Sequence, residues 1–262
     1  MRFIVLNKKQ IIIFTVIIAV AIGVVLLSGR AVMTFLVGDR QIPIYSVERA
    51  DNKIALTFDC AWNDDDIDEI ISILKQNNCT ATFFVTGKWA EAYSDSLNKL
   101  HRSGFEIGVH SYNHDDYTKM SSDEILADIE KTEKAIMRAT GEKPSLVRTP
   151  SGAYNNIAVS TVENSGRYCI QWSVDGLDYV DTTKETIYER VVPNTKSGDI
   201  ILLHNGTKLT AQILPDIVKG LKSNYNLVNV SDLIYKEKYT IDNTGRQYAT
   251  DSSELEEEAS HI

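Results

Sequence analysis

Residues 53–60 read Lys-Ile-Ala-Leu-Thr-Phe-Asp-Cys, a mainly apolar run that ends beside a carboxylate. Residues 53–58 have the length and composition of a buried strand. Ile67, Ile70, Ile71 and Leu74 follow at helical spacing, so a helix with one apolar face comes next. A buried strand followed by such a helix predicts one unit of a parallel sheet.

The alternation of strand and helix continues along the chain. Further short apolar runs predict strands at 81–85, 105–109, 146–148, 169–174, 200–203 and 226–230. Helical patterns separate most of them, notably at 121–136, 155–164 and 210–222. About seven such units in roughly 190 residues predict an α/β fold, an irregular (β/α)7-type barrel with its chemistry at the carboxyl ends of the strands.

The N-terminal segment predicts a membrane anchor. Residues 11–27 are almost wholly apolar, which is just long enough to cross a bilayer core of about 30 Å. Arg2, Lys8 and Lys9 precede the run, so the positive-inside bias keeps the N-terminus in the cytoplasm and puts the rest of the chain outside. We therefore expect an uncleaved transmembrane signal anchor and a single-pass protein of the cell membrane; a cleaved signal peptide is the alternative.

The chain of 262 residues is expected to have four parts. These are a cytoplasmic stub with the transmembrane helix (1–30), a linker (31–50), one catalytic domain (51–236) and an acidic, disordered tail (237–262). The formal net charge of −9 argues against a general affinity for nucleic acid, whose phosphates require Lys and Arg. Cys60 and Cys79 fall at opposite ends of the predicted sheet, so we expect no disulfide between them.

The run His110-Ser111-Tyr112-Asn113-His114 places two imidazoles four residues apart, in a chain with five histidines. Two imidazoles at this spacing can face one divalent metal ion, and a catalytic site usually has three protein ligands with one position left for water. When the motif is taken alone, a solvated or structural pair of histidines is the simpler alternative.

Other polar residues fall at the ends of the predicted strands. Asp59 follows the first strand, the histidine pair follows the third, Arg148 ends the fourth and His204 follows the sixth. The end of the fifth strand carries Trp172, Asp175 and Asp178. Because the carboxyl ends of parallel strands share one edge of the sheet, these side chains are expected to form one site.

This set of residues predicts metal-assisted hydrolysis. A divalent ion lowers the pKa of bound water toward ~7 and polarises a carbonyl group. Asp59 would take a proton from the attacking water, and Arg148 would hold Asp59 ionised and oriented. His204 would protonate a leaving nitrogen.

Five short motifs resemble those of the polysaccharide deacetylases of carbohydrate esterase family 4, the NodB-homology domain. They are Thr57-Phe58-Asp59-Cys60, His110-Ser111-Tyr112-Asn113-His114, Arg148-Thr149-Pro150-Ser151-Gly152, Asp175-Gly176-Leu177-Asp178-Tyr179 and Leu202-Leu203-His204. They occur in the family's order, and the resemblance extends from about Ile54 to Ile234.

The resemblance implies a role for each matching residue. It makes Asp59 the catalytic base, positioned by Arg148, and His204 the general acid, tuned by Asp178. It also implies an acetyl pocket and an oxyanion site, formed by Trp172, Leu202 and the backbone N–H of Ser151.

The third metal ligand is where the chain departs from the family pattern. The resemblance implies that His110 and His114 bind the ion, but Cys60 stands where the family has a metal-binding aspartate. Asp64, close behind Cys60, could replace that aspartate, and water is a further alternative; we rank Asp64 and water above Cys60. Zinc is the expected metal, with cobalt or another transition metal as alternatives.

The resemblance and the predicted location indicate an enzyme of the outer cell surface. It is expected to remove N-acetyl groups from an amino-sugar polysaccharide of the cell wall, with peptidoglycan first among the candidates. The expected partners are this glycan and, through the N-terminal helix, the membrane. One alternative, motivated by Cys60, is a catalytically weak relative that binds glycan in a structural or sporulation role. Another is an enzyme that acts on a different N- or O-acyl substrate.

Overall fold

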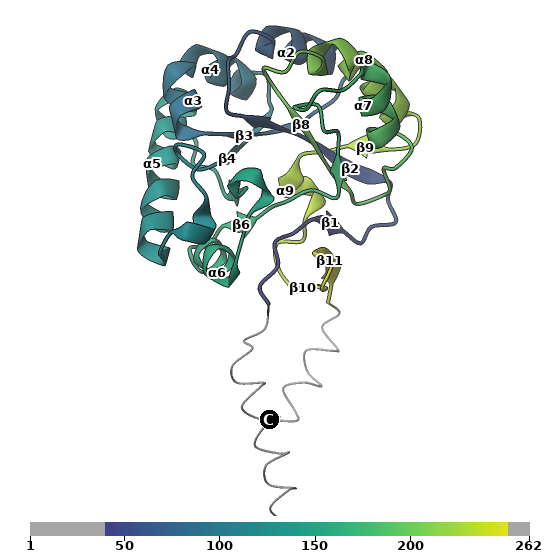
Figure 1. Cartoon of the computed structure of the whole chain (residues 1–262). Coiled ribbons are helices and arrows are strands. Elements are labelled where there is room, and N and C mark those ends of the chain that lie inside the picture. Colours follow the sequence, from purple (N-terminus) through teal and green to yellow (C-terminus); the bar gives the residue numbers. More distant parts are fainter. Residues whose placement is uncertain (1–39, 251–262) are drawn as a thin grey trace, which may run out of the picture. The chain divides into compact units, whose positions relative to one another are not determined.

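A computed structural model of the chain describes residues 40–250 (Figure 1). Its main sheet contains β2 (Lys53–Cys60), β3 (Thr82–Val85), β4 (Glu106–Val109), β5 (Leu146–Val147), β6 (Tyr168–Cys169), β7 (Val174–Asp175), β8 (Ile200–His204) and β9 (Asn226–Leu227). The order across the sheet is β6-β5-β4-β3-β2-β8-β7, and β9 pairs with the beginning of β2. All of these pairings are parallel, so the sheet curls into a half-barrel whose carboxyl ends lie along one edge.

Helices cover the outer face of the sheet (Figure 1). They are α2 (Ile67–Gln76), α3 (Gly87–Ala92), α4 (Ser94–Arg102), α5 (Ser122–Thr140), α6 (Asn156–Asn164), α7 (Lys184–Val191) and α8 (Thr210–Lys222), with the short 3₁₀ helices η1 (Tyr117–Lys119) and η2 (Pro150–Gly152) between them. The longest, α5, begins with a capping box, in which Ser121 and Glu124 each accept a hydrogen bond from the other's backbone N–H. The expected α/β fold of alternating strands and helices is therefore confirmed.

Strand β2 has two faces with different surroundings. Ile54, Leu56, Phe58 and Cys60 point into the core between the sheet and the helices. Because side chains alternate along a strand, Thr57 and Asp59 point to the concave face of the sheet. Register places Asp59 beside His204 of β8, so the two end residues are neighbours at the carboxyl edge.

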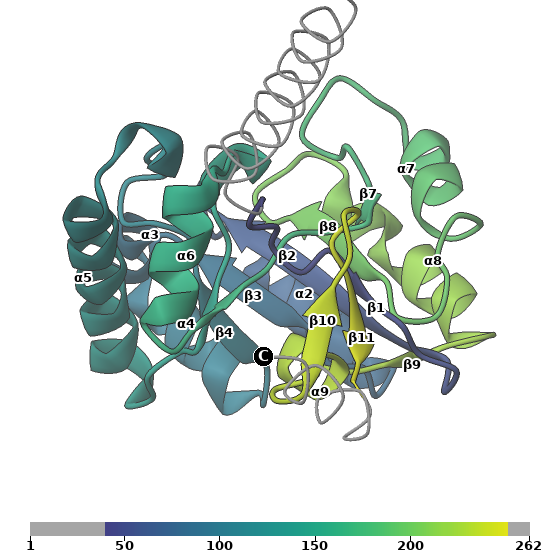
Figure 2. The same ribbon diagram turned by 90° about the horizontal axis from the view of Figure 1, so that it is seen from below.

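The concave face is closed by elements from both ends of the described chain. A second apolar cluster there joins Ala55 and Phe84 of the sheet to Ile44, Val47 and α9 (Val230–Leu233). A small sheet of β1 (Ser46–Val47), β10 (Tyr239–Ile241) and β11 (Arg246–Ala249) adjoins it. In Figure 2 the β10–β11 hairpin lies nearest the viewer, and its turn points toward β7.

Three predictions about boundaries are wrong. Ile44, Ser46 and Val47 are buried in the fold, so the expected linker at 31–50 ends before its last residues. Residues 239–241 and 246–249 form a hairpin rather than a disordered tail, because β10 pairs with β11 and β11 pairs with β1. The strand expected at 169–174 is split into β6 and β7, since Ile170 between them pairs with Ile44 instead.

Two further expectations concern the cysteines and the membrane. Cys60, Cys79 and Cys169 are all buried free thiols, as expected for a chain that does not rely on disulfides. Between residues 40 and 250 no helix is long and apolar enough to span a bilayer. The predicted anchor at 1–30 lies outside the described residues.

Candidate active site

A cavity of about 390 Å³ lies at the carboxyl edge of the main sheet. Its lining consists of Asp59, Ala61, Trp62, His110, His114, Ser151, Trp172, Tyr179, Leu202 and His204. Seven of the ten predicted site residues therefore line one cavity. Two more, Arg148 and Asp178, lie directly behind it in contact with Asp59 and His204. The tenth, Asp64, is elsewhere.

Asp59 and Arg148 form a buried ion pair. Nη1 of Arg148 donates to Oδ1 of Asp59 at 2.7 Å and to the Thr57 hydroxyl at 2.8 Å. Burial by itself raises the pKa of Asp59, but the neighbouring positive charges outweigh it, so that pKa lies below its usual range. Asp59 is thus ionised at neutral pH and oriented by Arg148, the state that a proton acceptor needs.

The imidazole of His110 is neutral and oriented in the way that metal binding requires. Its Nδ1 lies 3.0 Å from the carbonyl oxygen of Arg148, and a carbonyl can only accept, so Nδ1 carries the proton. Burial lowers the pKa of His110 to about 4. Its Nε2 therefore carries a lone pair and faces Oδ2 of Asp59 at 3.3 Å. Two acceptors this close favour a cation between them, and the ring of His114 lies 4.9 Å from that of His110.

Neither side chain considered as a third ligand reaches this position. Cys60 points into the core on the opposite face of β2, and burial raises the pKa of its thiol well above the usual value. A protonated thiol on the wrong face does not bind a metal. The carboxylate of Asp64 accepts a hydrogen bond from Ser96 on α4 at 2.6 Å and does not line the cavity. The prediction of Asp64 as a metal ligand is therefore wrong in this structure.

The donor set consequently fits a metal ion only in part. His110 and His114 present two imidazoles, but within residues 40–250 no three His, Cys, Asp or Glu side chains are grouped to hold an ion. Of the three alternatives for the third ligand, only water remains. The residues that the structure describes do not complete the expected three-ligand site, and no chemical step is assigned to a metal.

His204 is held by a network on the other side of the cavity. Its Nδ1 contacts Oδ1 of Asp178 at 2.8 Å, and its backbone N–H donates to Oδ2 of the same carboxylate at 2.8 Å. The buried hydroxyl of Thr210, the first residue of α8, also donates to Oδ2. Burial lowers the pKa of His204, but the hydrogen bond that the imidazole donates to Asp178 and the nearby carboxylates of Asp59, Asp178 and Asp175 raise it by more, so the net shift is upward. His204 is therefore suited to carry and donate a proton.

Two exposed aromatic rings flank His204. The ring of Trp62 lies 5.4 Å from the imidazole and that of Tyr179 lies 4.8 Å from it. Their exposed fractions are 49% and 48%, which is unusual for such large apolar side chains. Trp62 is therefore not packed in the core. Rings at the mouth of a cavity offer faces on which a sugar can stack.

Trp172, in the segment between β6 and β7, forms part of the cavity wall. Its Nε1 donates to Oδ2 of Asp175 at 3.3 Å, which fixes the indole. Gly152, with φ +66°, lets the η2 turn approach that indole: a Cβ there would lie 3.0 Å from the ring. Ser151, in the left-handed region at φ 55°, and Leu202 complete this wall.

The sequence did not reveal two supports of the site. One is Thr210, described above. The other is Asp128 of α5, which accepts hydrogen bonds from the backbone N–H of Tyr112 at 3.0 Å and from the Tyr117 hydroxyl at 2.5 Å. Asp128 thereby holds the loop between the two histidines, where Ser111 and His114 have positive φ. A polar residue beside the apolar stripe of a predicted helix was the only signal for Asp128.

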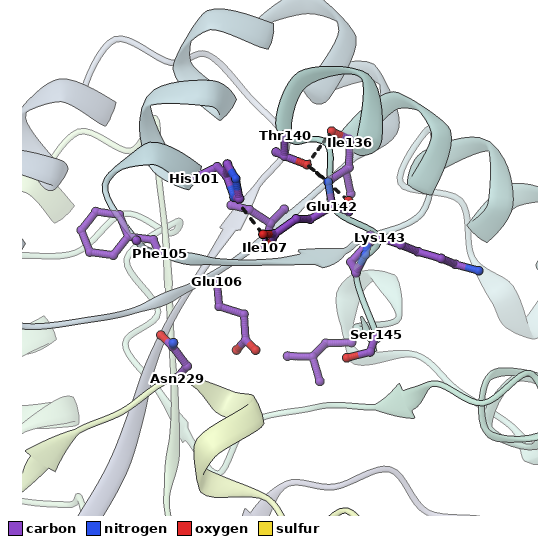
Figure 3. Close-up of a pocket in the computed structure, with 13 residues that line it drawn as sticks. His101, Phe105, Glu106, Ile107, Ile136, Thr140, Glu142, Lys143, Ser145 and Asn229 are labelled. Atoms are coloured by element: carbon purple, nitrogen blue, oxygen red, sulfur yellow. Dashed lines mark hydrogen bonds and ion pairs between the residues drawn. The ribbon is translucent and has the colours of Figure 1, made fainter.

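A larger cavity, of about 450 Å³, lies at the opposite edge of the sheet, beside the first residues of β4 and β5 (Figure 3). Its polar side chains are Glu106, Glu142, His101 and Lys143, among others. Glu106 accepts hydrogen bonds from Thr82 and from the backbone of Ser231, and His101 lies 3.9 Å from Glu142. Glu106 is thus satisfied within the fold, and the contact of His101 with the exposed Glu142 is too long for a hydrogen bond, so size does not make this cavity the candidate site.

A carboxylate held ionised opposite a histidine whose pKa is raised, at the carboxyl edge of a parallel sheet, defines a hydrolase-type site. Comparison with known sequences is more specific. The sequence model of the polysaccharide deacetylase family matches residues 46–170. The chain is 33% identical over 209 residues to the peptidoglycan-N-acetylglucosamine deacetylase PgdA of Listeria monocytogenes. The aligned region covers 79% of this chain but only 43% of PgdA. This chain thus spans less than half of that relative.

Solved structures agree with this relation. The peptidoglycan deacetylase PdaC of Bacillus subtilis is 34% identical, with a TM-score of 0.65 over 71% of this chain and 92% of that one. A pseudoenzyme of carbohydrate esterase family 4 from Bacillus anthracis is 29% identical, with a TM-score of 0.71 over 75% of this chain and 70% of that one. The chain belongs to the polysaccharide deacetylase family, and the resemblance found in its five motifs is confirmed.

Proposed function

We propose that this chain hydrolyses the acetamide of N-acetylated amino sugars in a cell-wall glycan, most specifically peptidoglycan. The observation that carries the proposal is the pairing of Asp59, kept ionised beside Arg148, with His204, whose pKa is raised beside Asp178, across one cavity. A proton acceptor and a proton donor that face one cavity are what hydrolysis of an amide requires. The peptidoglycan deacetylases PgdA and PdaC among the relatives support the choice of substrate.

Each step has a residue in place. Asp59 takes a proton from a water molecule while the oxygen of that water attacks the acetyl carbonyl carbon. His204 delivers its proton to the amide nitrogen as the C–N bond breaks, which gives acetate and a free amine. The backbone N–H of Ser151 would donate to the oxygen that becomes negative in between, and a single such donor is worth roughly 10²–10³ in rate. Trp172 and Leu202 would enclose the acetyl methyl group.

Whether acetate release requires a divalent ion is left to the test below. Zinc is the first candidate for this ion and cobalt the second. His110 and His114 are the residues that would hold it, and such an ion would polarise the acetyl carbonyl and acidify water. The steps assigned above to Asp59 and His204 do not depend on its position.

The test is acetate release from oligomers of N-acetylglucosamine and from peptidoglycan, with and without a chelator. Release from either substrate supports the deacetylase, and loss of release on chelation with recovery on added zinc supports the ion. A folded chain that releases no acetate from any of these substrates, even with added zinc or cobalt, would contradict the proposal.

Two observations support a second candidate function. Within residues 40–250 no side chains complete the three-ligand metal site, and one of the similar structures is a pseudoenzyme. A catalytically weak relative would bind glycan on Trp62 and Tyr179 and release little acetate. Glycan binding with acetate release no faster than that of a His204→Gln variant would favour this second function.

We also propose that residues 11–27 anchor the protein in the cell membrane and that the catalytic domain lies outside the cytoplasm. This rests on the sequence alone: a long apolar run follows Arg2, Lys8 and Lys9. Protease treatment of intact cells tests it. Digestion of the domain, with the chain recovered in the membrane fraction, is the expected result; recovery in the soluble cytoplasmic fraction contradicts it.

A further inference from the structure

A second groove adjoins the candidate active site. It has a volume of about 590 Å³ and lies between α7, β7 and the turn of the β10–β11 hairpin. We call it the side groove and define it by Tyr45, Trp172, Asp175, Arg190, Lys196 and Arg246. Trp172 lines both the side groove and the catalytic cavity, so one indole separates the two spaces.

Three cationic side chains line the side groove together with two carboxylates, Asp175 and Asp199, in a chain whose formal net charge is −9. Arg190, Lys196 and Arg246 come from three separate segments and meet there. The two carboxylates in its lining are occupied within the fold. Asp175 accepts from Trp172 and from the backbone of Leu177, and Asp199 accepts from Ser173 and from the backbone of Lys196.

The cations retain donors for a ligand. Arg190 spends its Nε on the backbone carbonyl of Asp175 at 3.0 Å, which fixes the guanidinium and leaves its terminal amino groups. Lys196 is exposed, and its Nζ makes no hydrogen bond or ion pair with any residue between 40 and 250. Arg246 is paired with Glu48 at 2.7 Å and contributes less. Arg190 and Lys196 are therefore the two main donors.

We propose that the side groove binds a carboxylate-bearing sugar of the same glycan whose acetamide enters the catalytic cavity. A guanidinium and an ammonium bind a carboxylate through charge-assisted hydrogen bonds, and the fixed Trp172 offers the sugar an apolar surface. The inference rests on the proposed function, since it takes the ligand to be the glycan substrate. It adds that the chain selects acidic glycans over neutral ones.

The test compares two tetrasaccharides of the same linkage and the same N-acetyl content. One is the neutral N-acetylglucosamine oligomer, and the other carries a lactyl carboxylate on every second sugar. Binding to the full chain is measured by calorimetry at low and at high salt. We expect the acidic oligomer to bind about tenfold more tightly, and the difference to shrink at high salt.

Variants separate this role from a structural one. The double variant Arg190→Gln with Lys196→Gln should bind the acidic oligomer as weakly as the neutral one and leave neutral binding unchanged. The matched control is Lys134→Gln with Arg138→Gln, an exposed pair on α5, which should keep the preference. Equal affinities for the two oligomers in the unaltered chain, or equal losses for both in the double variant, overturn the proposal.

Two further outcomes distinguish the alternatives. Competition by millimolar inorganic phosphate would make the side groove a general anion site and overturn the assignment to a carboxylate. A preference for the acidic oligomer without acetate release leaves this inference standing while the deacetylase proposal fails. If acetate is released with equal efficiency from both oligomers and both bind with equal affinity, the deacetylase proposal stands while this inference fails.

Discussion

The cavity has two sides, and the protein satisfies the polar atoms on only one of them. Around His204, both oxygens of Asp178 are engaged, by the imidazole, by a backbone N–H and by Thr210. Around His110, the free imidazole nitrogen faces the carboxylate of Asp59 with no donor between them, and the position of the expected third ligand is turned into the core. The acid side is complete in itself, whereas the histidine-pair side requires something from solution.

The difference originates in the alternation of a single strand. Asp59 and Cys60 are consecutive, so their side chains leave β2 on opposite faces. Residue 59 can reach Arg148 and the cavity, while residue 60 packs among apolar side chains, where a thiol is stable and a carboxylate would be costly. A catalytic base can therefore persist on this strand independently of the ligand beside it.

The largest expected effect is loss of the acid. His204→Gln removes the group that protonates the leaving nitrogen, and acetate release should fall about 10²–10⁴-fold, because a placed proton donor contributes that much. The measurement is kcat on N-acetylglucosamine oligomers. His101→Gln, at the opposite edge of the sheet, is the matched control and should keep the rate. A His204→Gln variant with at least a third of the normal rate would show that the acid side is not catalytic.

The next effect is on stability and concerns the buried ion pair between Arg148 and Asp59. Arg148→Met leaves the buried carboxylate of Asp59 without its cation, which should lower the free energy of unfolding by about 3–5 kcal/mol. Denaturant titration measures it. The double variant Arg148→Met with Asp59→Asn should recover most of the loss, since no buried charge remains. A double variant as unstable as the single one would place the cost in packing around Arg148 instead.

The outcome of sequence reasoning follows the same division. Asp59, Arg148, Asp178 and His204 could be found because each lies at or just beyond the carboxyl end of a strand, and these ends meet at one edge whatever the details of packing. Asp64 was misplaced because spacing cannot show that Ser96, on another helix, takes its carboxylate. Thr210 and Asp128 were missed because their partners lie 32 and 16 residues away, at separations that carry no periodic signal. The hairpin at 239–249 was missed because it is short, polar and pairs with the distant β1.

A smaller effect tests the support of the acid side. Thr210→Val removes a hydrogen-bond donor from Asp178, so more negative charge remains on that carboxylate, the imidazolium is stabilised more and the pKa of His204 rises; its charged neighbours Asp59 and Asp175 and the Tyr179 ring are unchanged. His204 acts in its protonated form, so activity is lost as pH rises through that pKa, and the alkaline limb of the pH profile should move to higher pH. A more basic His204 is a weaker proton donor, so at neutral pH the rate should fall roughly two- to tenfold, the equivalent of one hydrogen bond.

Two measurements separate this role of Thr210 from simple packing. Thr210→Ser keeps the hydroxyl and should keep the pH profile, whereas Thr210→Val should shift it. The NMR titration of His204 should show the same shift without any turnover. An unchanged titration in Thr210→Val, together with a uniform loss of activity at every pH, would make Thr210 a packing residue only.

The smallest expected effects are on the histidine-pair side. They test whether that side lacks a third protein ligand. Cys60→Ala should cost roughly 1 kcal/mol of stability as a small cavity opens in the core, and it should leave metal content unchanged, because the thiol faces away from the imidazoles. Asp64→Ala should likewise leave metal content unchanged, since its carboxylate is bonded to Ser96. His114→Ala is the positive control and should lower zinc uptake measured by equilibrium dialysis. If either Cys60→Ala or Asp64→Ala lost the ion as fully as His114→Ala, the protein would itself complete the site, and the histidine-pair side would be as self-sufficient as the acid side.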